Sequence, residues 1–180
     1  MQSYIVNEEA VYCAIGEMTV KFQLLENELR EISWFCAEPT DATAGPTRGF
    51  GRIVDHAKKA VSAYLDRSGV AKDAAIRSHF AAAFQRCRDV ATRRNRAVHS
   101  LYRHYETLHG KPMLVRTWTE KARQGSIEIK NERVTEATIT SVLQDLKVAY
   151  EAMFGLHRQL MYSLQTILAR GEGRPTILTS

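Results

Sequence analysis

The sequence has few cysteines and no long hydrophobic segment, and these two absences exclude several classes of protein. Its three cysteines, Cys13, Cys36 and Cys87, are odd in number and show no CxxC motif or disulfide-framework spacing. Each lies among apolar neighbours, so we interpret them as small buried residues in a reducing compartment. No apolar segment approaches the ~18 residues that a membrane-spanning helix needs. The amino terminus lacks the basic start of a secretory signal. We therefore expect a cytoplasmic protein that has no association with a membrane.

The sequence also lacks a recognisable motif for a metal or a cofactor. Glu106 and His109 have the Glu-x-x-His spacing that di-iron bundles use, but such a bundle needs a second copy and none occurs. We therefore predict no metal site and no cofactor.

The overall composition is that of an ordinary globular domain. Hydrophobic residues make up 44% of the 180-residue chain and charged residues 25%. This length supports one hydrophobic core more comfortably than two. We expect a single domain over residues 1–180, with a flexible tail at about 171–180.

Apolar residues recur at alternating steps of three and four residues, which indicates long helices. The expected helices cover residues 7–38, 52–67, 72–108 and 135–170. Pro39 and Gly110-Lys111-Pro112 end the first and third helices, and Thr135 is the expected N-cap of the last. Segments 113–119 and 126–130 are rich in β-forming residues and predict two short strands. The predicted fold is mainly all-α, an antiparallel bundle of four main helices with a short β-hairpin before the last helix.

Charge is distributed unevenly along a chain whose net charge is +5. Residues 8–38 hold seven glutamates and two basic residues, whereas residues 86–103 hold six arginines and a single aspartate. A basic stripe of this kind suits a phosphate-rich partner. The alternative is that the acidic first helix packs beside the basic third helix, so that their charges largely neutralise one another. The two interpretations are compatible in part.

The apolar stripe of the third helix is interrupted by Arg94. A guanidinium at a core position is costly unless it is paired or serves a function. Asn95 follows Arg94 directly. His99 lies four residues after Asn95, and Tyr102 lies three residues after His99, so helical spacing places Asn95, His99 and Tyr102 on one face. Arg103 flanks this face. Arg94 lies about 140° around the helix from His99, but its long side chain can curl toward the same place.

The segment Arg94-Asn95-Arg96-Ala97-Val98-His99 resembles the motif of the HEPN superfamily, in which an Arg is followed by a His after four to six residues. The layout is similar too, with a long first helix carrying Leu25-Glu26-Asn27-Glu28-Leu29, a motif helix, a hairpin and a closing helix. In the toxin branch of the family the motif continues as His-x-Tyr. Here one extra residue separates His99 from Tyr102, which puts a modifiable tyrosine and a matching antitoxin in doubt.

The resemblance implies a metal-independent endoribonuclease with Arg94, Asn95 and His99 as its catalytic residues. A histidine can move protons near neutral pH, an arginine can hold the scissile phosphate, and RNA supplies its own nucleophile, the 2′-OH. Because one histidine cannot easily serve as both acid and base, the family forms homodimers in which two motifs share a composite site. The resemblance also suggests a role in defence or growth arrest, with an antitoxin or regulatory protein as a further candidate partner.

Other side chains of the basic stripe are candidate RNA contacts. They are Arg86, Arg88, Arg93, Arg96, Tyr102 and Arg103. Structural interpretations stay open beside these roles. The arginines can form a solvated face, Tyr102 can be a packing residue, His99 can cap a polar pocket, and Arg94 can pair with Glu26 or Glu28. The alternative function is a non-catalytic helical module that binds RNA or another protein.

Overall fold

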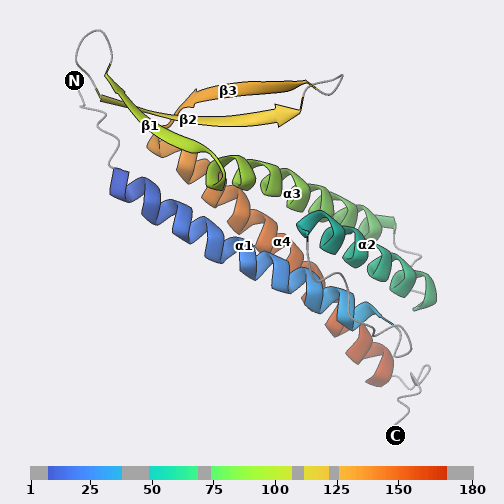
Figure 1. Cartoon of the computed structure of the whole chain (residues 1–180). Helices are drawn as coiled ribbons and strands as arrows, with labels where there is room; N and C mark the ends of the chain where they lie inside the picture. Colours follow the sequence, from blue (N-terminus) through green and yellow to red (C-terminus); the bar gives the residue numbers. More distant parts are fainter. Residues whose placement is uncertain (1–7, 38–48, 69–73, 107–111, 122–125, 170–180) are drawn as a thin grey trace, which may run out of the picture.

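The computed structural model describes residues 8–37, 49–68, 74–106, 112–121 and 126–169, and most of these are helical, as expected (Figure 1). The elements in chain order are α1 (Glu8–Cys36), α2 (Phe50–Arg67), α3 (Ala74–Val98), β1 (Leu101–Glu106), β2 (Pro112–Lys121), β3 (Ile127–Arg133) and α4 (Glu136–Ala169). The tail expected at 171–180 lies outside the described residues. None of the described helices is both long and apolar enough to span a membrane.

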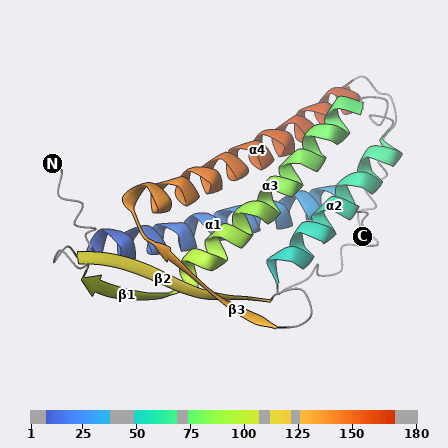
Figure 2. The ribbon, with the colours of Figure 1, turned by 90° about the horizontal axis from the view of Figure 1, so that it is seen from above.

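Of the four helices that the structure describes, three run in the same direction. Phe22 of α1 packs on Phe50 at the start of α2, and Phe35 packs on Tyr64 near the end of α2, so α1 and α2 are parallel. Helix α4 runs beside α1 in the same direction, and α3 runs against the other three (Figures 1 and 2). The expected antiparallel arrangement therefore holds for α3 alone. The parallel course of α1 and α2 has a physical reason, because the contact between Phe22 and Phe50 holds the start of α2 beside the middle of α1.

The apolar stripes predicted for the helices form the core. All eight stripe positions of α1 are buried or half-buried, and Leu25, Leu29 and Ile32 are fully enclosed. Burying a side chain of this size contributes about 1.5–3 kcal/mol. Cys36 and Cys87 are buried as expected, but Cys13 is exposed, because it lies two residues from Val11 and therefore off the stripe.

Helix α3 ends at Val98, before the expected end at 108, and the chain continues into strand β1. Two side chains bind the last helical carbonyl groups. Ser100 Oγ donates to the carbonyl of Arg96, and Tyr102 Oη donates to the carbonyl of Ala97 over 2.6 Å. Strand β1 then pairs with β2 along its whole length, so ladder hydrogen bonds replace helical ones. The prediction of one long helix was wrong here because tertiary strand pairing overrides the local helical pattern.

The three strands form an antiparallel sheet in the order β1-β2-β3. The two expected strands are β2 and β3, and β1 extends them to a three-stranded sheet. The sheet lies against the helices where α3 ends and α4 begins (Figure 2). Val134 N donates to the Leu114 carbonyl over 2.8 Å and joins the sheet to the start of α4. Thr135 Oγ1 accepts a hydrogen bond from Thr138 N over 3.1 Å, which confirms the predicted N-cap.

Candidate functional site

Asn95 and His99 line one groove at the end of α3. His99 follows the last helical residue, and its N–H donates to the Asn95 carbonyl over 2.9 Å, which continues the helical turn. The groove has a volume of about 390 Å³ and opens between the end of α3 and strand β2. Its lining residues are Thr92, Asn95, Arg96, His99, Trp118, Thr119 and Glu120. The imidazole of His99 is exposed there and is accessible to a ligand.

Arg94 does not line this groove. Its guanidinium carbon lies 4.7 Å from the ring centroid of Phe22 on α1, and Nη1 donates to Asn95 Oδ1 over 3.1 Å. Its Nε is buried and has no hydrogen-bond partner. Burial lowers the pKa of Arg94, while the nearby charge of Glu26 acts in the opposite direction. The structure thus separates two residues of the predicted motif: Arg94 packs toward α1, whereas His99 faces the groove.

Trp118 is the aromatic wall of the groove, and two arginines flank it. The guanidinium carbon of Arg96 lies 5.8 Å from the indole ring centroid, and that of Arg116 lies 5.4 Å from it. Trp118 Nε1 donates to Glu120 Oε1 over 2.9 Å, and Arg96 Nη2 lies 2.6 Å from the same oxygen. These partners, above all the Trp118 hydrogen bond, lower the pKa of Glu120. A flat aromatic ring between cations is a surface on which a nucleic-acid base can stack.

A second hollow of about 350 Å³ lies next to the first and shares Arg96 with it. Arg93 and Arg116 also line it, together with side chains from the first turns of α4. Arg116 is only 8% exposed, and its Nε and Nη2 both donate to Glu132 Oε2. Sequence reasoning missed Arg116 and Trp118, although their strand was predicted, because only the sheet brings them beside α3.

Most arginines of α3 form ion pairs with carboxylates of α2, β2 and α4, whereas Glu26 of α1 acts on Arg94 only through its nearby charge. Arg88 pairs with Asp55 of α2, Arg93 pairs with Asp145 of α4, and Arg96 pairs with Glu120 of β2. The alternative that carboxylates neutralise many of these arginines is therefore confirmed, but the expectation that the first helix supplies those carboxylates was wrong. In the described part of the chain, Arg86 and Arg103 are exposed and form no ion pair.

The other predicted contact residues fall on opposite faces of β1. Tyr102 is half-buried, hydrogen-bonded to the Ala97 carbonyl, and its pKa is raised mainly by burial. This is the packing role that was the alternative for Tyr102. Arg103 is the next residue of the strand, so its side chain points to the other face of the sheet. Tyr102 and Arg103 therefore do not join His99 on a helical face, because the helix has already ended.

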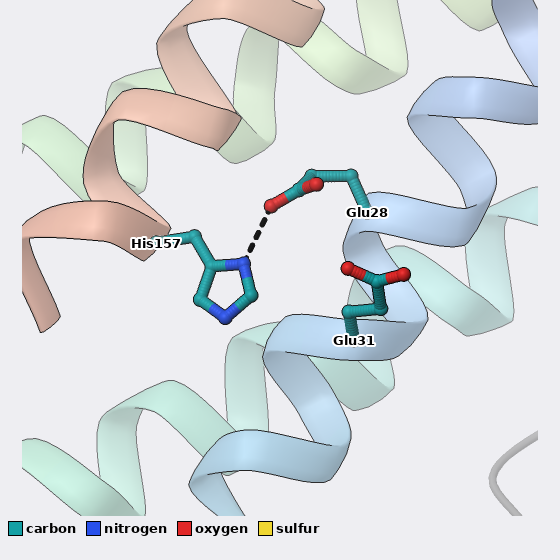
Figure 3. Close-up of side chains that lie close together, drawn as sticks. All are labelled: Glu28, Glu31 and His157. Atoms are coloured by element: carbon teal, nitrogen blue, oxygen red, sulfur yellow. Dashed lines mark hydrogen bonds and ion pairs between the residues drawn. The ribbon is translucent and has the colours of Figure 1, made fainter. Parts of the chain in front are cut away.

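A second polar cluster lies between α1 and α4. Figure 3 shows Glu28 and Glu31 of α1 directed toward the side of the bundle where His157 of α4 lies. His157 Nδ1 is 2.6 Å from Glu28 Oε1, and both residues are buried. One ligand atom from each of the three residues lies within 4.8 Å of the other two. Sequence reasoning missed this cluster because 129 residues separate Glu28 from His157. The available signal was a histidine inside the apolar stripe of the last helix.

No protein-family model matches the sequence, and comparisons with curated proteins and with solved structures also give no match.

Proposed function

We propose that this protein binds RNA in the groove between the end of α3 and β2, and that it cleaves RNA as a HEPN-type endoribonuclease without a metal ion. The observation that supports this proposal is the groove itself, in which the exposed imidazole of His99 lies with Asn95, Arg96 and the aromatic ring of Trp118. The groove offers a proton-transfer group, hydrogen-bonding groups and a stacking surface in one place.

The proposed reaction uses the 2′-OH of RNA as its nucleophile. A general base removes the 2′-OH proton, the 2′-oxygen attacks the adjacent phosphorus, and the bond to the 5′-oxygen breaks. A general acid gives a proton to that leaving oxygen, which yields a 2′,3′-cyclic phosphate and a free 5′-OH. Arg96 is the guanidinium that lines the groove with His99, and it would stabilise the negative charge on the phosphate.

Two proton-transfer groups are needed, and each groove contains one histidine. We propose a C2 homodimer in which the ends of the two α3 helices approach each other, so that one His99 acts as base and the other as acid. Arg94 holds the Asn95 amide through its own side chain, so we assign it a positioning role within each protomer.

The decisive experiment measures cleavage of a fluorescent single-stranded RNA by the purified protein in EDTA. His99→Ala should lower the rate by about 100-fold or more, the contribution expected of a positioned acid or base. The substitution should leave the thermal midpoint unchanged, because the side chain is exposed. His79→Ala is the matched control, since His79 is also exposed and lies on α3, away from the groove residues. Equal activity of His99→Ala and the wild type would refute the proposed mechanism.

A non-catalytic RNA-binding module is the second candidate function. The position of Arg94 over Phe22, away from the groove, favours it, because the guanidinium of the predicted motif does not lie beside His99. Under this alternative the RNA stays intact, and Trp118→Ala weakens binding by about 1–3 kcal/mol per stacked base. Trp34→Ala is the control, because Trp34 is exposed on α1. RNA affinity that falls steeply with added salt, and falls further with Arg86→Glu, would assign the binding to phosphate contacts.

A further inference from the structure

We propose that Glu28, Glu31 and His157 form a binding site for one divalent first-row transition-metal ion, which links α1 to α4. This site is separate from the proposed RNA groove, because none of its residues lines that groove. The proposal rests on the geometry, charge and packing of the three side chains.

The three candidate ligand atoms lie close together in the folded chain. One carboxylate oxygen each from Glu28 and Glu31 and one ring nitrogen of His157 lie within 4.8 Å of one another (Figure 3). Metal–ligand bonds of about 2.1 Å in a tetrahedral ion place ligand atoms about 3.4 Å apart. Small side-chain rotations are enough to reach this spacing. Glu28 and Glu31 are three residues apart on α1, so one helical face presents both carboxylates.

The charge of the cluster also favours a cation. Glu28 is 5% exposed, and its carboxylate faces His157 at 2.6 Å, with no arginine or lysine paired to it in the described part of the chain. The Glu31 carboxylate forms no hydrogen bond or ion pair among the described residues. The closest arginine in sequence, Arg30, pairs with Glu26 instead. A doubly charged ion would neutralise both carboxylates and would take the place of the proton between Glu28 and His157.

Packing holds the ligands in place. The ring of Phe35 lies edge-on to the His157 imidazole at a centroid distance of 5.6 Å, which limits rotation of the imidazole. Around the cluster, Leu29 and Ile32 of α1 and Met153 of α4 are fully enclosed, so the two helices cannot easily separate. A site on two packed helices is better ordered before binding than a site on loops.

The ligand types select the class of ion. Two carboxylate oxygens and one imidazole nitrogen suit Zn²⁺, Mn²⁺, Fe²⁺ or Co²⁺, whereas Mg²⁺ and Ca²⁺ prefer oxygen ligands alone. Three protein ligands leave at least one coordination position for water, on the side where Glu31 is exposed. Because Glu28 and His157 come together only in the folded chain, the ion should bind the native state and raise the thermal midpoint.

The test uses the full chain without an affinity tag, freed of metal by EDTA and dialysis, and titrated with ZnCl₂ in a calorimeter. We expect one Zn²⁺ per chain, a rise in Tm on adding Zn²⁺, and no comparable rise with MgCl₂. Glu31→Gln should weaken Zn²⁺ binding by about tenfold or more, since even the loss of an outer-shell partner costs about 10–100-fold. Glu31 is exposed, so this variant should fold even if His157→Ala does not.

Glu17→Gln is the matched control, because Glu17 is also an exposed carboxylate on α1 and lies outside the cluster. It should bind Zn²⁺ as the wild type does. The absence of stoichiometric Zn²⁺ binding, or equal affinity in Glu31→Gln and the wild type, would overturn the proposal. Equally tight Mg²⁺ binding would overturn the assignment to a transition metal.

Discussion

Charged side chains lie both at the interface between α1 and α4 and beside the sheet, near the groove. The two regions differ in how far these side chains are buried. Glu28 and His157 are buried, and each depends on the other as its hydrogen-bond partner. In the second hollow, next to the groove, Arg93 forms an ion pair with Asp145, and both side chains are about 40% exposed, so water solvates both of them. Burial therefore determines how much one lost partner costs: the buried pair is strongly coupled, whereas the exposed pair can be separated cheaply.

The same contrast extends to function. The groove exposes His99, and the Arg96–Glu120 ion pair beside it is partly solvated, so separating that pair costs little free energy. Glu28 and His157 are buried between packed helices and only Glu31 of the cluster is exposed, so the proposed site suits an ion and cannot admit a large ligand. Four measurements test this contrast and the local stability of the fold, from the largest expected effect to the smallest.

Thiol reactivity should show the largest difference. Burial raises the pKa of Cys36 and of Cys87 from 9.0 to about 12, whereas Cys13 is exposed. At pH 8 the reactive thiolate fraction of the two buried thiols should be about a thousandfold below that of a thiol with an ordinary pKa. Iodoacetamide should therefore label Cys13 alone in the native protein and all three cysteines in guanidinium, as read by mass spectrometry. Rapid native labelling of Cys87 would contradict its burial.

The same shift predicts a loss of stability in alkali. The folded chain keeps the Cys36 and Cys87 protons up to a pH of about 12, whereas the unfolded chain loses them near pH 9. The thiols therefore contribute fully below pH 9, and the free energy of unfolding should fall as the pH rises from about 9 to about 12. Urea unfolding across this range measures the effect. Serine at both positions removes the two thiols and should reduce this dependence, leaving the part due to Tyr64 and Tyr102, whose pKa values burial also raises.

Removal of the buried histidine should have the next largest effect. In metal-free buffer His157→Ala leaves the Glu28 carboxylate buried without its partner, which should lower the free energy of unfolding by about 3–5 kcal/mol. Asp145→Ala removes the partner of Arg93 at an exposed pair and should cost at most about 1 kcal/mol. Denaturant unfolding of both variants under the same conditions tests the contrast. Equal losses would mean that burial does not separate the two regions.

Loss of the α4 N-cap should have the smallest of these effects. Thr135→Ala removes the oxygen that accepts the hydrogen bond from Thr138 N, and should lower the free energy of unfolding by about 0.5–2 kcal/mol. Thr135→Ser keeps the hydroxyl group and should recover most of the loss. An equal loss in both variants would mean that the threonine methyl group, rather than the cap, is responsible.

The helices were predictable from the sequence because their signal is local. The apolar stripes of α1 and α4 repeat over many turns, and nearly every described stripe position is buried. The N-cap at Thr135 was predictable for the same reason. The end of α3 was not predictable from the sequence. Residues 99–106 have both helical spacing and strand-forming side chains, and pairing with β2 makes residues 101–106 a strand instead of a continued helix.

The candidate site was predictable only in part. The spacing of Asn95 and His99 correctly indicated that they would share one surface, and they line the same groove. The position of Arg94 was not predictable, because the aromatic ring that attracts its guanidinium, Phe22, belongs to another helix. Trp118 and Arg116 lie at the site because strand pairing holds β2 in the sheet. No local sequence pattern predicts that this strand lies beside α3.

By itself, the sequence determined the mainly helical class, the buried stripes and the basic character of the third helix, because these depend on residues only a few positions apart. The tertiary structure decided the parallel course of α1, α2 and α4, the third strand, the partners of each arginine, and the meeting of Glu28 with His157 across 129 residues. The reason is physical: side chains distant in sequence interact only when packing brings their helices and strands together, and the free energy of that packing belongs to the whole chain.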